Sequence, residues 1–179
     1  MAATAHLMTV EEFRMLPEDQ GPVYHELRHG ELVSVTHPKL KHLLIQGKLR
    51  DFLKKLAEPG SLIETEVAFR PLPEYELRVA DVAWLSAERL ASADMDDNIQ
   101  GAPDLVIEVL SPSNTAVEIY DNEKLCLENG CREFWIVDPE RRQVKVSTPD
   151  GHTVTYPTGQ EIVLALFGGA ALPVKDIFD

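Results

Sequence analysis

Two acidic residues, Asp81 and Glu108, stand alone inside short apolar segments. Asp81 lies in VADVAWL, residues 79–85, and Glu108 lies in LVIEVL, residues 105–110. Burying an uncompensated carboxylate costs several kcal/mol, so each needs a hydrogen-bond partner, a counter-charge or a cation. Neighbouring strands place opposed Cα atoms about 5 Å apart. We therefore expect the pair to hold Mg²⁺ or Mn²⁺, cations that take oxygen ligands and can activate water for attack on a phosphodiester.

Asp104 is a rival partner for Glu108, because both fall on the same face of the predicted strand. Four residues at about 3.3 Å each separate them by about 13 Å, which is too far for one ion. We expect Asp104 instead to receive hydrogen bonds from backbone or arginine groups where the strand begins.

A lysine on the helix after Glu108 is the predicted third participant. Lys124 falls between Val117 and Tyr120 around the helix, so it is expected to face partly inward. There its ammonium group would position or deprotonate the attacking water. A surface lysine whose aliphatic stem lies along the protein is an equally good interpretation.

The charge of the chain is unevenly distributed. The net charge of −13 argues against a general nucleic-acid binder, because neutralising phosphate needs lysine and arginine. Residues 28–55, however, carry seven basic and two acidic residues, a net +5, which leaves −18 on the remainder. This pattern predicts a basic helix face that contacts nucleic acid through Lys41, Lys48, Lys54 and Lys55, or a solvated face with no such role.

Apolar spacing and turn residues predict an α/β sandwich with a mixed sheet. Capping-box pairs, Thr9 with Glu12 and Thr115 with Glu118, mark two helix starts. From residue 41 the predicted order is helix, three strands, helix, strand, preceded by a short helix and a hairpin and followed by a second hairpin. The expected elements are a helix at 9–16, a hairpin at 23–35, a helix at 41–57, strands at 61–72, 79–85 and 104–110, a helix at 115–129, a strand at 132–139 and a hairpin at 142–156. Glu64 and Glu66 share one face of the first long strand.

Length and composition favour one domain spanning residues 1–179. No apolar run approaches the roughly 18 residues of a membrane span, and the N-terminal segment lacks the features of a signal peptide, so we expect a cytoplasmic protein. Cys126 and Cys131 are too few for a disulfide framework or a four-cysteine zinc site, and are expected to be reduced structural thiols.

Four strings of the sequence together resemble a known family. YHELRHGELV, LRVADVAWLSAERL, GAPDLVIEVLSPSN and NGCREFWIVDP are similar to segments of the Uma-type family of restriction-endonuclease-like proteins, within the PD-(D/E)XK nuclease superfamily. The resemblance covers nearly the whole chain. It implies a restriction-endonuclease-like αβββαβ core and a Mg²⁺- or Mn²⁺-dependent endodeoxyribonuclease that acts on nucleic acid, with DNA as the expected substrate and a homodimer as a possible assembly.

The same resemblance implies roles for individual residues. The acid of the family's Pro-Asp strand falls on Asp81, with Ala80 in place of proline, and the acid of its Glu-Val-Leu-Ser-Pro-Ser segment falls on Glu108. Leu110 occupies the superfamily's lysine position. The lysine that replaces it in the family usually stands eight residues before the glycine, where this chain has Asn122.

Glu26 and His42 also match family positions. The resemblance makes Glu26 a further metal ligand or a support for the ligands, although it is equally well placed to pair with Arg28 or His25. A histidine such as His42 is more often a hydrogen-bonded structural residue than a catalytic base.

Two other functions compete with the nuclease. With Asn122 in place of lysine and an acidic surface, the chain could be a catalytically degenerate domain that binds nucleic acid or protein. It could also be purely structural, with the carboxylates satisfied by Arg70 or Arg78.

Overall fold

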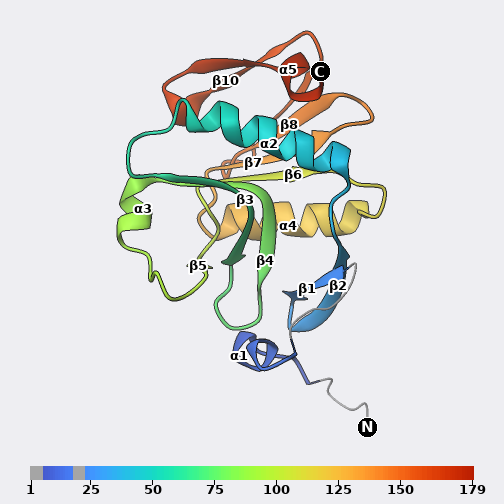
Figure 1. Cartoon of the computed structure of the whole chain (residues 1–179), viewed down its shortest axis with the longest axis vertical. Coiled ribbons are helices and arrows are strands. Elements are labelled where there is room, and N and C mark those ends of the chain that lie inside the picture. Colours follow the sequence, from blue (N-terminus) through green and yellow to red (C-terminus); the bar gives the residue numbers. More distant parts are fainter. Residues whose placement is uncertain (1–5, 18–22) are drawn as a thin grey trace.

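A computed structural model describes residues 6–17 and 23–179 of the chain. Five α-helices, one 3₁₀ helix and eleven strands occur in this part (Figure 1). The helices are α1 (Val10–Arg14), α2 (Leu40–Lys54), α3 (Ala87–Ala91), α4 (Ala116–Glu128), η1 (Ala165–Phe167) and α5 (Val174–Phe178). The strands are β1 (Val23–Arg28), β2 (Glu31–Thr36), β3 (Leu62–Arg70), β4 (Arg78–Leu85), β5 (Ile99–Gln100), β6 (Leu105–Val109), β7 (Glu133–Asp138), β8 (Gln143–Ser147), β9 (Thr153–Pro157), β10 (Glu161–Leu164) and β11 (Ala170–Pro173).

Seven strands form one mixed sheet in the order β5-β3-β4-β6-β7-β8-β9. The β3–β4 and β4–β6 pairs are antiparallel, whereas β6 and β7 are parallel. A parallel pair needs a crossover, and α4 supplies it between β6 and β7. The predicted α/β class, mixed sheet and αβββαβ order are therefore confirmed.

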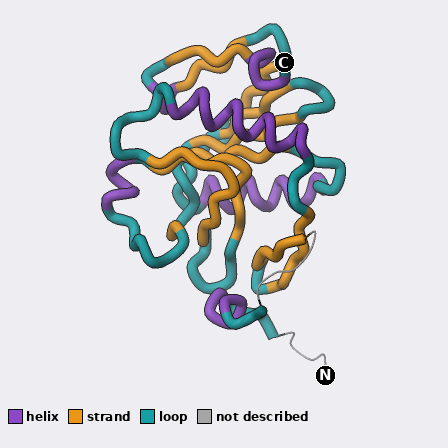
Figure 2. The backbone as a smooth tube through the Cα atoms, viewed as in Figure 1, coloured by secondary structure: helices purple, strands orange, loops and turns teal. Residues whose placement is uncertain are grey.

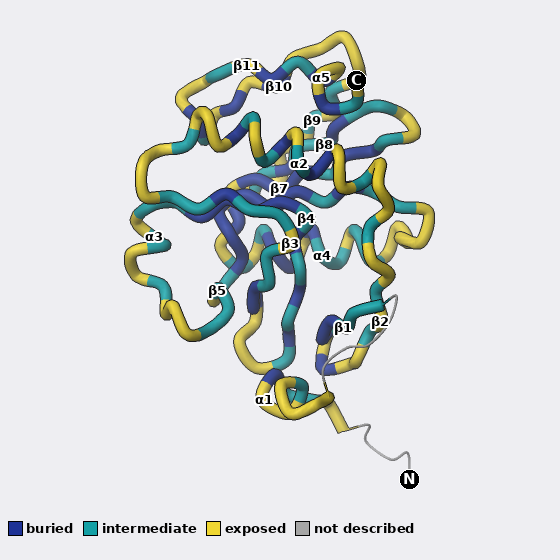
Figure 3. The backbone as a smooth tube through the Cα atoms, in the orientation of Figure 1, coloured by how far each residue is buried: buried dark blue, intermediate teal, exposed yellow. Residues whose placement is uncertain are grey.

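The two long helices cover opposite faces of this sheet, with α2 above it and α4 below it in Figure 1. On the α2 face, Leu49 and Leu53 pack with Ile107 and Trp135 in the larger core cluster, which also takes in the C-terminal β10-β11 hairpin and α5. On the α4 face, a smaller cluster forms around Phe134. Figure 3 shows the burial concentrated in the central strands. These strands are nearly continuous apolar runs because both of their faces are covered.

The N-terminal hairpin lies outside the main sheet, next to α1 (Figure 2). Its turn is His29-Gly30, whose φ angles of 51° and 74° are those of the tight turns that connect twisted strands. A Cβ atom at Gly30 would lie 2.8 Å from Cβ of Leu7, so glycine is required for space as well as for conformation. The predicted hairpin is confirmed, as is the capping box of Thr9 and Glu12.

The structure differs from the predicted elements in two places. Helix α3 and the two-residue strand β5 lie between the predicted strands at 79–85 and 104–110, where no element was predicted. The tail beyond residue 156, for which no element was predicted either, forms β10, β11 and α5 and packs on the α2 face. Both segments have short elements whose pattern is set by tertiary contacts rather than by amphipathic periodicity.

None of the helices in the described ranges is long and apolar enough to cross a membrane. Residues 1–5, which belong to the segment judged to lack a signal peptide, lie outside those ranges.

The packing of α2 predicts a clear contrast between two leucines of the same helix. Leu53 is fully buried, whereas Leu44 is 58% exposed. Leu53→Ala should lower the free energy of unfolding by about 2–5 kcal/mol, because it removes buried methyl groups and leaves a cavity. Leu44→Ala should change it by less than about 0.5 kcal/mol. Urea denaturation of both variants measures the difference, and equal effects would contradict this packing.

Candidate functional site

The candidate site lies where β4 and β6 part. Their antiparallel pairing ends at Val82 opposite Ile107, and the next pair in this register would be Asp81 opposite Glu108. Instead of a continued backbone ladder, Oδ2 of Asp81 accepts a hydrogen bond of 2.6 Å from the backbone N–H of Val109. The Asp81 side chain therefore occupies the gap between the diverging strands, next to Glu108.

Two residues of α2 hold Asp81 from the other side. Gln46 Nε2 donates to Asp81 Oδ1 over 2.8 Å, and His42 Nε2 lies 2.9 Å from the same oxygen. The His42 nitrogen is buried, but the two atoms are not aligned as a hydrogen bond. Because α2 is anchored by its apolar stripe, the positions of these polar residues are fixed by packing.

Glu66 brings a further carboxylate to this place. It stands opposite Asp81 in the β3–β4 register, and Gln46 donates to its Oε1 over 2.5 Å. Its φ of 54° is rare for a residue other than glycine, and such strained backbone is concentrated at functional sites. Glu66 is an exposed residue, but partial desolvation of its carboxyl group and the charge of Asp81 raise its pKa, and the hydrogen bond from Gln46 opposes the rise.

Glu108 points toward the α4 face. Its neighbours Ile107 and Val109 belong to the α2-side core, and Asn122 of α4 donates to Glu108 Oε1 over 3.3 Å. Burial raises the pKa of Glu108 well above its ordinary value, and the charges of Asp81 and Glu26 add to the rise. The nearby guanidinium groups of Arg28 and Arg78 oppose it. Asp81 and Glu108 are thus held from opposite faces of the sheet, and the charge of Asp81 acts on the Glu108 carboxyl group.

Strand β1 forms one wall of the site with alternate residues. Burial raises the pKa of Tyr24, and so do the charges of four carboxylates, those of Glu26, Glu66, Asp81 and Glu108. Glu26 is 5% exposed and accepts a hydrogen bond from Arg28 Nε over 3.0 Å. The period of a strand explains why residues 24 and 26 face the same side.

Of the alternatives left open for Glu26, the structure shows the pair with Arg28, while its role as a metal ligand or as a support for the ligands stays a prediction. The predicted role of Asp104 is confirmed. Its Oδ2 accepts from the backbone N–H of Ser86 over 2.8 Å, and its Oδ1 lies 3.7 Å from Arg89 Nη1. Asp104 therefore anchors the start of β6 and takes no part in the site.

Lys124 does not lie where its spacing suggested. Its side chain is 70% exposed, and its Nζ lies 3.9 Å from Glu128 one turn along α4. The expectation that it faces partly inward is wrong, because the buried stripe of α4 runs through Glu123, Leu125 and Cys126. At Glu108 the structure places Asn122 instead. The catalytic role predicted for Lys124 stays untested.

The four lysines of the predicted basic face are all exposed on α2 or at its end. Lys54 pairs with Glu64 at 2.5 Å, and Lys48 donates to the backbone carbonyl of Asp179. Within residues 6–17 and 23–179, no acidic partner is found for Lys41 or Lys55. The ammonium groups of these two lysines are therefore available to bind an external anion.

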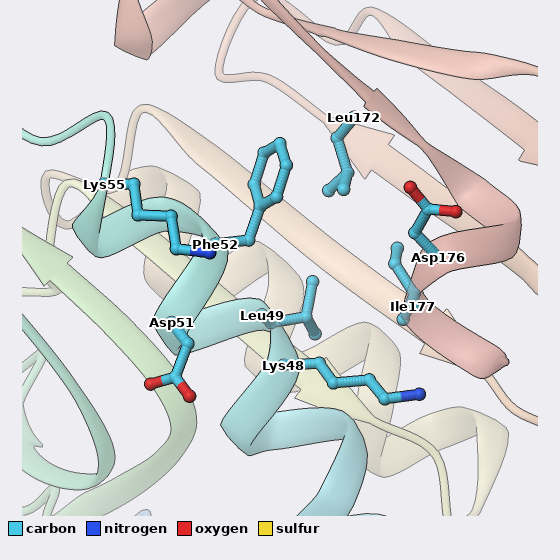
Figure 4. Close-up of a pocket in the computed structure, with 8 residues that line it drawn as sticks. All are labelled: Lys48, Leu49, Asp51, Phe52, Lys55, Leu172, Asp176 and Ile177. Atoms are coloured by element: carbon cyan, nitrogen blue, oxygen red, sulfur yellow. The ribbon is translucent and has the colours of Figure 1, made fainter.

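A groove of about 280 Å³ runs between α2 and α5, away from the carboxylates (Figure 4). Phe52 and Leu172 contribute apolar walls, and Lys48, Lys55 and Asp176 lie along its rim. None of the carboxylates described above lines it, so it is separate from the Asp81–Glu108 gap.

The arginines of the structural alternative are engaged elsewhere. Arg70 pairs with Asp97 at 3.0 Å, and Arg78 pairs with Glu76 at 2.7 Å. Among the described residues, neither makes a direct ion pair with Asp81 or Glu108. The direct pairing that this alternative names is therefore absent, although the charge of Arg78 still acts on Glu108 from a distance.

The donor set is compatible with a hydrated divalent cation rather than with an all-protein cage. No group of three or more His, Cys, Asp or Glu side chains arranged to hold a metal occurs in the part of the chain that the structure covers. Mg²⁺ commonly takes one or two carboxylates and keeps several waters. The buried His42 Nε2 also lacks an aligned partner, and a water of such an ion beside Asp81 could supply one.

Sequence reasoning missed Gln46, Glu66 and Tyr24. Gln46 lies on the buried stripe of α2 and is 1% exposed, so a glutamine among apolar positions was a usable signal. Glu66 could be assigned to a strand face, but its left-handed backbone could not be foreseen. The place of Tyr24 in the site could not be predicted, because it depends on where the N-terminal hairpin packs against the rest of the protein.

Comparison with known proteins identifies a family and similar solved structures. The family described as "Uma2: Putative restriction endonuclease" matches residues 10–175. A crystal structure described as a putative nuclease belonging to DUF820, from Anabaena variabilis ATCC 29413, has a TM-score of 0.80 and 24% sequence identity, with 96% of this chain and 97% of that chain covered. At that identity the likeness concerns the fold. No curated protein matches the chain.

The raised pKa of Glu108 predicts a pH-dependent gain in stability when its charge is removed. The folded state holds the proton more tightly than the unfolded state, where the pKa is about 4.3. The free energy of unfolding should therefore fall as the pH rises from there through the folded pKa. In metal-free buffer containing chelator, the free energy of unfolding of Glu108→Gln should exceed that of the wild type by about 1 kcal/mol or more at pH 8. At pH 4 the two free energies should be equal. Denaturation at both pH values checks this. Glu128→Gln, an exposed control, should show no such difference, and a stability loss for Glu108→Gln at pH 8 would contradict the assignment.

Proposed function

The chain belongs to the Uma2 family, and from this premise we propose that it is a divalent-metal-dependent nuclease that hydrolyses phosphodiester bonds of nucleic acid. The observation that carries the proposal is the juxtaposition of Asp81 and Glu108 where β4 and β6 part. The family and its fold support a nuclease-type function in general. The metal, the residues and the preference for DNA belong to the proposal.

Asp81 and Glu108 would hold Mg²⁺ or Mn²⁺. When bound, such a cation polarises the phosphate and lowers the pKa of water for attack. Hydrogen bonds from Gln46 and from the Val109 N–H leave the Asp81 carboxylate little freedom to rotate. The hydrogen bond from Asn122 likewise restricts the rotation of the Glu108 carboxylate. The protein thus fixes the two ligands before substrate arrives, which reduces the reorganisation needed in the transition state.

In the reaction, a water oxygen forms a bond to phosphorus and the bond from phosphorus to one ester oxygen breaks. The water loses a proton, and the leaving oxygen gains one from solvent. Glu66 is the candidate acceptor of the first proton, because its raised pKa and its place beside Asp81 suit a general base. The exposed position of Lys124 does not favour the water-orienting role predicted for it.

Cleavage assays on both carboxylates test this function. Asp81→Asn and Glu108→Gln should each lower the cleavage rate with Mn²⁺ by about 100-fold or more, because each removes a negative ligand in the site. Duplex DNA, single-stranded DNA and RNA are offered separately, with and without chelator. Asp150→Asn and Glu128→Gln are the matched surface controls and should cleave like the wild type. Unchanged cleavage by Asp81→Asn would remove Asp81 from the mechanism.

A second function, a degenerate domain that only binds nucleic acid or protein, is favoured by Asn122, a neutral group in contact with Glu108. Mn²⁺ separates the two candidates. A functional site should gain thermal stability with millimolar Mn²⁺ by linkage, whereas a degenerate one should not.

The exposed lysines of α2 generate a prediction about nucleic-acid affinity. Lys41→Ala together with Lys55→Ala should weaken binding and make the slope of log K against log salt shallower by about 1–2, because each lysine would displace one counterion. Fluorescence anisotropy over a salt series measures the slope. Lys175→Ala, an exposed lysine of α5, is the control, and an unchanged slope in the double variant would exclude this face.

A further inference from the structure

The proposed nuclease site has an excess of negative charge, and among the residues that the structure describes no lysine pairs with Asp81 or Glu108. Its carboxylates converge on one gap, while the family's lysine position holds Asn122 and Lys124 lies on the exposed face of α4. A scissile phosphate brings further negative charge, which increases in the transition state. A cation from another part of the chain is therefore needed beside the phosphate.

Arg28 reaches this place from the N-terminal hairpin. Its Nη1 donates to Oε1 of Glu118 on α4 over 3.0 Å. One turn further along the same face of α4, Asn122 contacts Glu108. Residues four apart on a helix have Cβ atoms about 5–6 Å apart. The guanidinium is thus anchored about one helical turn from the contact that holds Glu108.

A second anchor ties Arg28 to the Asp81 strand. Arg28 Nε donates to Glu26, and the backbone of the neighbouring Leu27 bridges to Leu77, the residue before β4; the backbone N–H of Val79 lowers the pKa of Glu26. Val79 is two residues before Asp81 on β4. Arg28 is therefore held by Glu26 of the hairpin and by Glu118 of α4, the helix whose Asn122 contacts Glu108, so that the hairpin closes one side of the site.

Other cations in the neighbourhood are less suited. The Arg78 side chain is 3% exposed and pairs with both Glu76 and Asp121, so substrate cannot reach it. Lys145 lies on β8, two strands from β6, and pairs with Glu123 at 2.8 Å. The Arg28 side chain is 20% exposed. Its Nη2 makes no hydrogen bond within the residues that the structure describes, and so keeps donors for an oxygen anion.

We propose that Arg28 is a catalytic residue of this site and contacts the scissile phosphate through its free guanidinium N–H groups. The inference rests on the proposed nuclease function. Glu26 and Glu118 act as positioning residues, because they hold the guanidinium plane. A planar guanidinium offers two parallel N–H groups to phosphate, which an ammonium group cannot reproduce.

Kinetics of three variants test the proposal. Arg28→Gln should lower kcat by about 100-fold with a smaller change in KM, because the contact strengthens as charge develops. Arg28→Lys should recover part of the loss. Free guanidinium at low millimolar concentration should raise the rate of Arg28→Ala, a rescue that a structural role would not give. Arg141→Gln, which removes a surface arginine, is the control.

Arg28→Gln leaves the buried Glu26 unpaired and could unfold the protein. The double variant Glu26→Gln with Arg28→Gln replaces the charged pair by a neutral pair of similar shape, and should keep the wild-type melting temperature and the stabilisation by Mn²⁺. If the folded double variant cleaves within threefold of Glu26→Gln alone, the role of Arg28 is overturned while the nuclease function stands. If the wild type cleaves no nucleic acid with Mg²⁺ or Mn²⁺, both proposals fall.

Discussion

The hydrogen bond from the Val109 N–H to the Asp81 carboxylate is the contact on which the arrangement of the site depends. A backbone donor next to a parting pair of strands must find an acceptor, since an unsatisfied buried N–H is costly. Here a side chain supplies it in place of the neighbouring strand. The same contact lets β6 diverge from β4 and places an acid in the opening. This one hydrogen bond therefore accounts for the divergence of the strands, for the acceptor of the Val109 N–H and for the position of Asp81.

The concentration of carboxylates around Tyr24 works against the stability of the fold. Glu26, Glu66, Asp81 and Glu108 all act on the phenol, and burial raises the pKa of several of these acids. Sites that are destabilised in this way are common where function requires it. The surrounding apolar packing of α2 and α4 offsets the repulsion, because neither helix can move away without losing buried contacts.

The N-terminal hairpin is part of this arrangement rather than an appendage. It is not paired with the seven-stranded sheet through a ladder, yet an isolated bridge joins Leu27 to Leu77 through two backbone hydrogen bonds. Leu27 is fully buried, which fixes the depth at which the strand docks. Alternate residues of β1 then face the carboxylates. The tight turn at His29-Gly30 matters to the site because it sets the register of that strand.

The sequence by itself determined the order of the main elements and the identity of two acids. Apolar runs and capping boxes are local signals, and an isolated acid such as Asp81 or Glu108 within an apolar strand is conspicuous without coordinates. Amphipathic periodicity likewise located α2 and α4. Only the tertiary structure decided which polar groups meet those acids. Contacts between segments distant in the chain decide the left-handed backbone at Glu66, the docking of Tyr24 and Arg28 from the hairpin, and the outward position of Lys124. Spacing along one helix or strand carries no information about such contacts.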